Sequence, residues 1–401
     1  MRLKLHWQIL IALLLSVPMG LFWPIFSLKT AAIGEVFLSA LKMIIIPLVL
    51  SSIISGISNI HVKELGRVGF KTMLYYLSTT TLAIIVGLVL VNIFKPGVGV
   101  ELAYKGDVTK VSEAAGNFGS TLKNIVPDNV FQAFVQADML SIIFFAILFG
   151  VFLSQVEEKY KTAVLNVNNG IFEVMIKMVN FVLRFSPLGI WSLVSAEIAN
   201  QKDIASLASG LGAYFLIVLA GLLIHSFVVL PLVLQLVAKS SFKKHFQAMA
   251  TPLLTAFSTS SSGATLPLTM DVVEYQAGVS NRITSFTLPL GATVNMDGTA
   301  LYECVAAMFI AQVYGIELSI VQQLIVVVTA LLASIGAAAI PMAGLVMITV
   351  VLSAIGLPLE AVGLIIAVDR PLDMLRTAVN VWSDSTGAIV IAKSEGEVLN
   401  Y

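Results

Sequence analysis

Long apolar runs alternate with short polar segments through the first part of the chain. Six such runs lie near residues 6–27, 31–57, 69–94, 131–155, 170–198 and 205–238. A helix needs roughly 20 apolar residues to cross about 30 Å of hydrocarbon, and each run reaches that length. The pattern therefore predicts six membrane-spanning helices in this part of the chain.

From residue 242 onward, the apolar runs are broken in the middle by small and polar residues. The breaks are STSSSGATLP at 258–267 and SIGAAAIP at 334–341, and each is followed by a helical stretch with polar groups at membrane depth. Irregular backbone is tolerated at that depth only where it is buried or lines a cavity. Paired interruptions of this kind indicate a transporter site built from re-entrant hairpins and broken helices.

The second polar stretch, residues 368–384, carries five charged groups between apolar flanks. On a helix that turns about 100° per residue, polar side chains form one stripe about 22 Å long. The stripe consists of Asp369, Asp373, Arg376, Asn380 and Asp384. Ionisable groups at membrane depth cost about 2.5 kcal/mol each or more, so they normally face a partner or a wet cavity. The stripe therefore predicts a substrate or ion site.

Arg376 follows Asp373 by one helical turn, and this spacing has two interpretations. The two side chains could form a purely structural intrahelical ion pair. Alternatively, the guanidinium binds a substrate carboxylate while Asp373 binds an ammonium group, which describes a zwitterion site. Arg370 lies off the stripe, and its role stays unassigned.

Composition supports a polytopic membrane protein. The 401 residues are 58% hydrophobic and 11% charged, against about 25% charged in soluble domains. The mean hydropathy is +0.96. The formal net charge is zero and no basic run occurs, which argues against nucleic acid as a partner. The lone Cys304 excludes an internal disulfide and a cysteine-based metal site.

The distribution of lysine and arginine predicts the orientation in the membrane. These residues flank alternate loops, near residues 2–4, 63–71, 159–161 and 239–244. Positive loops stay on the cytoplasmic side, so we expect a cytoplasmic N-terminus in a cell inner (plasma) membrane. The first apolar run continues too far for a signal peptide and is interpreted as a span. The polar residues 97–130 are expected to form an external loop.

The serine-rich break at 258–267 is compatible with three interpretations. Serine and threonine allow close helix packing in membranes, so the segment could be a packing patch. A hairpin tip that offers NH and hydroxyl groups to an anion accounts better for its four serines. A serine nucleophile is disfavoured, because no histidine lies in a candidate motif and His225 is alone in the sixth run.

The segment NMDGT at 295–299 interrupts an apolar helix with Asn295, Asp297 and Thr299. It could be a simple kink, or an unwound turn whose carbonyl oxygens, amide and carboxylate are the ligands that Na⁺ prefers. Asp297 and Asp384 are therefore the leading ion-ligand candidates.

The segment YYLSTTT at 75–81 is a cluster of hydroxyl groups in an apolar run. The favoured interpretation is that these hydroxyls donate to backbone carbonyls of their own helix.

Four segments resemble, in order, those of the dicarboxylate/amino acid:cation symporters, which include the excitatory amino acid transporters and prokaryotic glutamate and aspartate transporters. They are SSSGATLP at 260–267, GATVNMDGTALY at 291–302, ASIGAAAIPMAG at 333–344 and DMLRTAVNVWSDSTG at 373–387. The resemblance covers essentially the whole chain. It implies an all-α fold with eight transmembrane helices, two re-entrant helical hairpins and inverted repeats, working as an elevator within a homotrimer.

The resemblance also implies domain boundaries and ligand roles. A scaffold would comprise 1–68 and 97–203, and a transport domain 69–96 and 204–401. The amino acid substrate would be bound by Ser261, Ser262, Thr299, Ile340, Gly344, Asp373, Arg376, Thr377 and Asn380. Sodium ions would be bound by Tyr76, Thr79, Thr80, Gly291, Thr293, Asn295, Met296, Asp297, Ser334, Ile335, Ala337, Asn380 and Asp384.

Departures from the family pattern bear on coupling and substrate. Ser260 stands where some prokaryotic members have arginine, and Arg370 is more typical of the proton-coupled bacterial branch. That branch usually lacks the acidic group matching Asp384, so sodium coupling is favoured. Asp373 matches a carboxylate of the family that favours an amino acid as the substrate. Arg376 matches an arginine that favours an acidic amino acid.

These features together predict a sodium-coupled symporter for glutamate and/or aspartate, not an enzyme. Its expected partners are the acidic amino acid, sodium ions, membrane lipid and two further copies of the chain. The alternatives are a proton-coupled glutamate or C4-dicarboxylate carrier, an anion channel and, least favoured, an intramembrane hydrolase.

Overall fold

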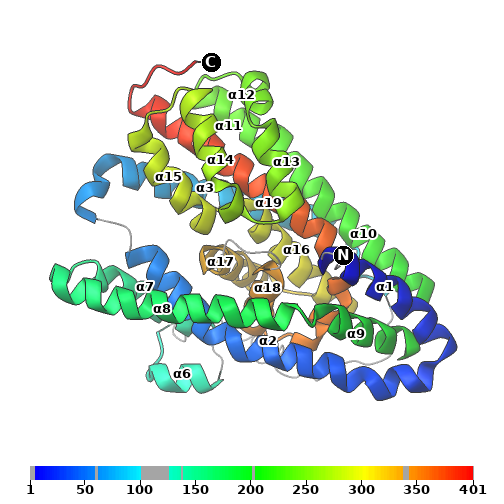
Figure 1. The fold of residues 1–401 in the computed structure, drawn as a ribbon. Coiled ribbons are helices and arrows are strands. Elements are labelled where there is room, and N and C mark those ends of the chain that lie inside the picture. Colours follow the sequence, from blue (N-terminus) through cyan, green and yellow to red (C-terminus); the bar gives the residue numbers. More distant parts are fainter. Residues whose placement is uncertain are drawn as a thin grey trace.

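A computed structural model of the protein describes residues 5–58, 62–100, 126–136, 139–200, 204–336 and 343–400. All regular elements within these residues are helices (Figure 1). The predicted all-α fold is therefore confirmed for the described part of the chain. Within the second hairpin segment, Ala337, Ile340 and Pro341 lie outside the described residues, as does most of the expected external loop.

The N-terminal helices pack mainly on one another and form one side of the molecule (Figure 1). They are α1 (Leu5–Phe22), α2 (Pro24–Ser58), α6 (Val130–Gln136), α7 (Met139–Leu153), α8 (Glu158–Leu183) and α9 (Ser186–Asn200). The long helix α2 contacts α1, α7, α8 and α9. It is thus the element around which this side is assembled.

Prolines set two boundaries that differ from the predicted spans. The chain breaks at Trp23, because Pro24 is well suited to begin a helix and begins α2. Residues 170–198, predicted as one span, divide between α8 and α9 with a break at Arg184 and Phe185. Pro187 explains this break, since proline lacks an N–H and disfavours a helix directly before it.

The remaining helices surround α19 (Val362–Ser394). The first group is α3 (Val62–Phe94), α10 (Ile204–Ile224), the π-helical turn η1 (His225–Val229) and α11 (Leu230–Leu236). The second is α12 (Phe242–Ala248), α13 (Ala250–Thr259), α14 (Ser262–Tyr275), α15 (Asn281–Val294), α16 (Asp297–Val313), α17 (Ile320–Gly336), α18 (Ala343–Ala354) and the 3₁₀ turn η2 (Leu359–Ala361). Helix α19 contacts α13, α14, α15 and α16, while α3 packs along α16.

The first predicted break is visible in the backbone. Helix α13 ends at Thr259, the next residue Ser260 has a left-handed conformation with φ 51°, and α14 begins at Ser262. The Ser261 hydroxyl accepts a hydrogen bond from the Ala264 N–H at 3.2 Å and so caps α14. Helices α13 and α14 pack against each other, as do α17 and α18.

Many large apolar side chains are exposed on the N-terminal helices, among them Phe22, Trp23, Ile25 and Phe152. Extensive exposed apolar surface marks contact with a membrane or with another protein chain. By length and composition alone, Arg67–Phe94 and Ala205–Leu236 could each cross a membrane. The first segment begins two residues before the predicted span 69–94, and the second lies within the predicted span 205–238.

Charged groups join the beginning of α3 to the end of α19. Arg67 donates from Nε and Nη2 to the two carboxylate oxygens of Glu395 at 2.9 and 3.0 Å, and Lys71 Nζ lies 2.6 Å from Oε1. The hydrogen bonds from Arg67, then those from Lys71, lower the pKa of the Glu395 carboxyl from 4.5 to about 2. The folded protein therefore favours the ionised form of this group.

We expect Glu395→Gln to lower the thermal stability of the detergent-solubilised protein at neutral pH. Because the pKa of Glu395 is depressed in the folded state, its stabilising contribution is complete above about pH 4.5 and disappears as the pH falls towards 2. The difference in melting temperature between parent and variant should therefore shrink below pH 4.5. Glu157→Gln, at an exposed site, is the control; a Glu395 difference that stays constant with pH contradicts the prediction.

Candidate functional site

The polar segment 295–299 forms an interruption between two helices. Helix α15 ends at Val294, and Asn295 and Met296 have non-helical backbone angles of φ −94°, ψ 78° and φ −110°, ψ 59°. Asp297 then begins α16. The expected unwound turn is thus present, and it aligns Asn295 and Asp297 towards α3 and α19, where both side chains are fully buried.

The Asp297 carboxylate accepts hydrogen bonds from three different elements. Thr80 Oγ1 of α3 donates to Oδ1 at 2.6 Å, and Ser383 Oγ of α19 donates to Oδ2 at 2.6 Å. His225 Nε2 of η1 lies 2.8 Å from Oδ2. A buried carboxylate is stable only when its oxygens are satisfied, and here hydroxyl and imidazole groups satisfy them.

His225 is a site residue that sequence reasoning missed. It is the only histidine in its apolar run, yet its ring contacts a carboxylate 72 residues away in sequence. The five-residue π-helical turn, which is rare and often found at functional sites, carries it. The signal in the sequence was the presence of an ionisable group within an apolar span.

Asp384 belongs to the same hydrogen-bonded network. Asn295 Nδ2 donates to Asp384 Oδ1 at 2.9 Å and to Ser383 Oγ at 3.0 Å. A Cβ atom on Gly291 would lie 2.5 Å from Asp384 Oδ1 and 2.7 Å from the Tyr76 hydroxyl. The backbone of α15 therefore approaches this carboxylate as closely as only glycine permits.

Two buried carboxylates, Asp297 and Asp384, thus share one network in which Asn295 and Ser383 are the links. Within the described residues, neither forms an ion pair with lysine or arginine, and His225 is the one titratable nitrogen in contact. Buried negative charges require a compensating positive charge. Carboxylate, amide, hydroxyl and carbonyl oxygens around them are the ligand set of a hard cation.

The hydroxyl cluster of α3 divides between two roles. Thr79 Oγ1 donates to the Tyr75 carbonyl at 3.1 Å, and Thr81 Oγ1 donates to the Leu77 carbonyl, as the intrahelical interpretation predicts. Thr80 instead bonds to Asp297, and the Tyr76 hydroxyl donates to the Thr287 carbonyl of α15 at 2.7 Å. Thr79 Oγ1 also lies 3.4 Å from Asn295 Oδ1 and from Asp297 Oδ1, so Thr79 and Thr80 both contact the buried network.

Some of the expected sodium ligands are not placed in this network by any hydrogen bond. Thr293 and Ser334 donate to carbonyls of their own helices. Met296 is buried within the interruption, Ile335 is partly buried on α17, and Ala337 lies outside the described residues.

The charged stripe on α19 forms a second cluster. Arg376 is 1% exposed. Its Nη1 donates to Asp369 Oδ1 at 3.0 Å, and its Nε and Nη2 donate to Asp373 Oδ1 at 3.2 and 2.9 Å. Arg370 Nη1 donates to the other Asp373 oxygen at 3.1 Å. Two acids and two guanidinium groups therefore balance one another.

Neighbouring helices fix the position of the Arg376 guanidinium. Its Cζ lies 4.1 Å from the centroid of the Tyr302 ring on α16, within range of a cation–π interaction. On the side of α18, a Cβ atom on Gly344 would lie 2.8 Å from Arg376 Cζ. Gly344 and Arg376, both expected substrate residues, therefore lie close together, whereas Ile340 lies outside the described residues.

The other expected substrate residues connect the two clusters. Asn380 accepts a hydrogen bond from the Gly298 N–H at 2.8 Å and donates to Thr299 Oγ1 at 3.1 Å. Thr377 Oγ1 donates to the Asp373 carbonyl, and Ser262 Oγ donates to the Ala292 carbonyl at 3.0 Å. Polar groups thus join α19 to α16, and α14 to α15.

Glu303 is a second residue that the sequence interpretation did not identify. It follows Tyr302 on α16 and is fully buried, and neither carboxylate oxygen has a hydrogen-bond partner among the described residues. An ionised carboxylate without a partner is strongly destabilised in this setting, so the group requires either a proton or a bound cation. An acidic residue inside a helix that is otherwise apolar was the available signal.

Comparison with known proteins gives a consistent result. Residues 5–394 match the sodium:dicarboxylate symporter family. The chain is 36% identical to the "Proton/glutamate-aspartate symporter" of Escherichia coli (strain K12), covering 98% of this chain and 93% of the relative. It is 38% identical to the "Proton/sodium-glutamate symport protein" of Bacillus subtilis (strain 168), covering 97% and 92%. Identity to "Excitatory amino acid transporter 3" of Mus musculus is 37%, covering 90% and 78%.

We expect Gly298→Ala to destabilise the protein by about 1–3 kcal/mol through overpacking. The new Cβ would lie 2.7 Å from the Arg376 carbonyl oxygen and 2.9 Å from its Cα, so α16 must move away from α19. Denaturation in detergent measures the loss. Gly363→Ala on α19, where a Cβ meets no atom within 4 Å, is the matched control, and equal stability of the two variants contradicts this packing argument.

Proposed function

The chain belongs to the sodium:dicarboxylate symporter family, and from that premise we propose that it imports glutamate and/or aspartate together with sodium ions. It is a transporter and not an enzyme, in keeping with its family and relatives. Acidic amino acid symport is the activity named for the bacterial relatives. What is proposed for this chain is the choice of ion and the residues that bind it.

The observation that carries the sodium proposal is the pair of buried carboxylates, Asp297 and Asp384. Both lie within one network of oxygen ligands without a paired lysine or arginine among the described residues. Sodium ions bound at these carboxylates would supply the missing positive charge. Asn295, Thr80 and the backbone of α15 near Gly291 would complete the coordination with amide, hydroxyl and carbonyl oxygens.

The substrate would bind at the α19 cluster beside these ions. The guanidinium of Arg376 presents a planar fork suited to the side-chain carboxylate of glutamate or aspartate. Asp373 would bind the ammonium group, while Asn380, Thr377, Thr299 and the hairpin segments around Ser261, Ser262 and Gly344 would contact the rest. For the carboxylate to bind, it must replace Asp369 or Asp373 on Arg376, since both hold that side chain now.

Charge balance explains why substrate and ions would be transported together. Without ligands, Asp369 and Asp373 balance Arg370 and Arg376, whereas Asp297 and Asp384 carry no such compensation. A substrate with net charge −1 adds to this deficit. Moving uncompensated charge through a low-dielectric layer is costly, so the partly loaded form would rarely cross. Coupling then follows from the differential affinity of the two states for their ligands.

The larger architecture is proposed on the same basis. The N-terminal helices would form the scaffold of a homotrimer in the cell membrane, using the exposed apolar faces of α2, α7 and α8. Residues 69–96 and 204–401 would move together as an elevator, with two re-entrant hairpins closing over the substrate. The packing of α3 along α16, and of α13–α16 around α19, supports their movement as one unit.

Proton coupling is a second candidate, and Glu303 is the observation that favours it. Its carboxylate is fully buried, has no partner among the described residues, and lies on the same helix as Tyr302, which covers Arg376. A proton would neutralise this carboxylate without requiring any further coordinating ligands. Relatives named for proton or for both proton and sodium coupling exist.

We expect labelled aspartate uptake into proteoliposomes to require an inward sodium gradient. In the isosteric variant Glu303→Gln, sodium-driven uptake should persist because Asp297 and Asp384 are unchanged, whereas any stimulation by a proton gradient should disappear. Glu274→Gln on α14, where the side chain accepts hydrogen bonds from Asn281 and Thr284, controls for the loss of an acid. Uptake driven equally by a proton gradient alone, and abolished in Glu303→Gln, would show that proton coupling is the correct alternative.

We expect Arg376→Cys to weaken aspartate binding at least about 30-fold, because truncating one partner of a buried charge pair costs about 2 kcal/mol or more. Binding is measured as sodium-dependent protection against thermal unfolding, with uptake as a second readout. Arg282→Cys on the exposed part of α15 is the matched control. Unchanged aspartate affinity in a folded Arg376→Cys protein removes this residue from substrate binding.

A further inference from the structure

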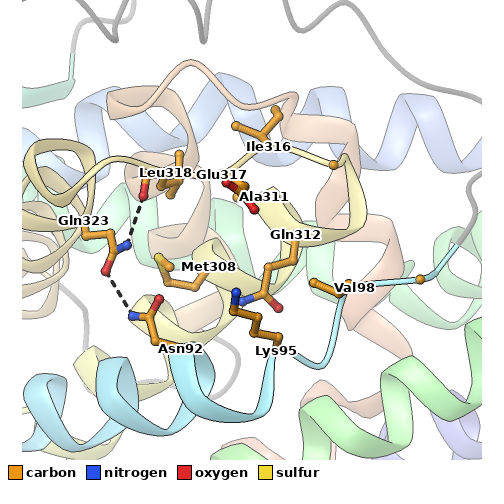
Figure 2. A pocket seen from close by; sticks show the side chains of 12 residues that line it. Asn92, Lys95, Val98, Met308, Ala311, Gln312, Ile316, Glu317, Leu318 and Gln323 are labelled. Atoms are coloured by element: carbon orange, nitrogen blue, oxygen red, sulfur yellow. Dashed lines mark hydrogen bonds between the residues drawn. The ribbon is translucent and has the colours of Figure 1, made fainter.

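A separate pocket lies where α3 and α16 end and α17 begins. Its volume is about 370 Å³, near the lower end of the roughly 300–1,000 Å³ typical of small-molecule sites. Figure 2 shows Asn92 and Lys95 from the end of α3, Met308 and Gln312 from α16, and Gln323 from α17 around one space. None of the residues that line it belongs to the substrate or ion clusters described above.

Hydrogen bonds between amide side chains fix the walls of the pocket. Asn92 Nδ2 donates to Gln323 Oε1 at 3.0 Å, and Gln323 Nε2 donates to the Leu318 carbonyl at 3.0 Å (Figure 2). Gln312 accepts from the Gly97 N–H at 3.1 Å and donates to the Val91 carbonyl at 3.2 Å. These bonds join all three helices, so the cavity is preformed.

The turn that carries Lys95 is held in an unusual conformation. Lys95 has φ 43°, which is in the left-handed region that favours glycine, and such strain persists only where the surroundings determine it. The next residues provide that constraint, because a Cβ on Gly97 would lie 2.6 Å from the Phe309 carbonyl of α16. The Lys95 backbone is therefore anchored at the pocket.

The pocket presents both charges and an apolar surface. The side chains of Lys95 and Glu317 form no hydrogen bond or ion pair with the rest of the described chain, and both are exposed. Met308 lies between the two walls in Figure 2, and its thioether can contact the edge of an aromatic ring. One cation, one anion and an apolar base match a small zwitterion with an aromatic side chain.

We propose that this pocket binds a neutral aromatic α-amino acid as an effector that is not itself transported. Lys95 binds its carboxylate, Glu317 binds its ammonium group, and Met308 contacts its ring. The bound molecule adds contacts between α17 and α3, the two helices already joined by Asn92 and Gln323. Its effect on uptake rests on the proposed transport function, whereas its binding does not.

The three helices connect the pocket to the transport site. α3 carries Thr80, α16 carries Asp297 and Tyr302, and α17 leads towards the segment before Gly344. An effector that binds one arrangement of these helices more tightly shifts the population towards it, and the coupling is reciprocal. The effector should therefore change the apparent affinity for aspartate, and aspartate should change the affinity for the effector.

The test uses the purified full-length protein in detergent and L-phenylalanine as the probe, titrated by calorimetry. Saturable binding is expected both without ligands and in the presence of saturating aspartate and sodium, and also in the Arg376→Cys variant. N-acetyl-phenylalanine, which lacks the ammonium group, and phenethylamine, which lacks the carboxylate, should each bind at least about fivefold more weakly.

Variants at the pocket give the second arm of the test. Lys95→Gln and Glu317→Gln should each weaken phenylalanine binding at least about fivefold, while Lys159→Gln and Glu157→Gln on an exposed segment leave it unchanged. Melting temperatures verify that each variant is folded. The proposal is overturned if phenylalanine shows no saturable binding, if saturating aspartate abolishes that binding, or if the variants and the modified ligands bind equally well.

The two proposals fail in distinguishable ways. If proteoliposomes show no aspartate uptake, the transport proposal fails, but calorimetry in detergent still decides whether the pocket binds phenylalanine. If uptake is present and phenylalanine binds without changing it, the effector role is wrong although the site is real.

Discussion

The burial of the Asp297 carboxylate is the constraint on which the rest of the site depends. An ionised carboxylate away from water is tolerated only with a full set of partners, and those partners come from α3, η1 and α19. Each donor fixes the position of its own helix relative to α16. The same bonds bring Ser383 and Asn295 to Asp384, so the second carboxylate is positioned as a consequence of the first.

In the α19 cluster, the buried charges are compensated by ion pairs within the helix itself. Arg370 and Arg376 balance Asp369 and Asp373 within two helical turns, so this region is stable before any substrate arrives. In the proposed site, that internal balance would make binding an exchange of partners, since a substrate carboxylate would displace an aspartate from Arg376. Selectivity would then depend on a new cation for the displaced aspartate, which the ammonium group of an amino acid would provide and a simple dicarboxylate would not.

Local patterns in the sequence predicted the helices, the first break and the polar stripe, because each depends on residues within a few turns of one another. The interruption at Asn295 and the burial of the stripe on α19 were correct for that reason. The contact of His225 with Asp297 was not predictable, since it joins residues 72 apart through a π-helical turn that carries no sequence signature. The division of residues 170–198 between α8 and α9 was available in Pro187, which hydropathy alone overlooks.

Helix rigidity relates the pocket at the end of α3 to the buried carboxylates. Asp297 is the first residue of the 17-residue helix α16, so it lies about 24 Å from the last residue, Val313, along an axis with 1.5 Å rise per residue. Packed helices move as units with discrete arrangements, because close-packed interiors deform little within one arrangement. The side-chain amides of Asn92, Gln312 and Gln323 form hydrogen bonds to neighbouring segments. These bonds therefore depend on the positions of α3 and α16, as the bonds to Asp297 do. A movement of α17 away from α3 would break the Asn92–Gln323 contact, whereas a movement of α3 away from α16 would break both the Gln312–Val91 bond at the pocket and the Thr80–Asp297 bond.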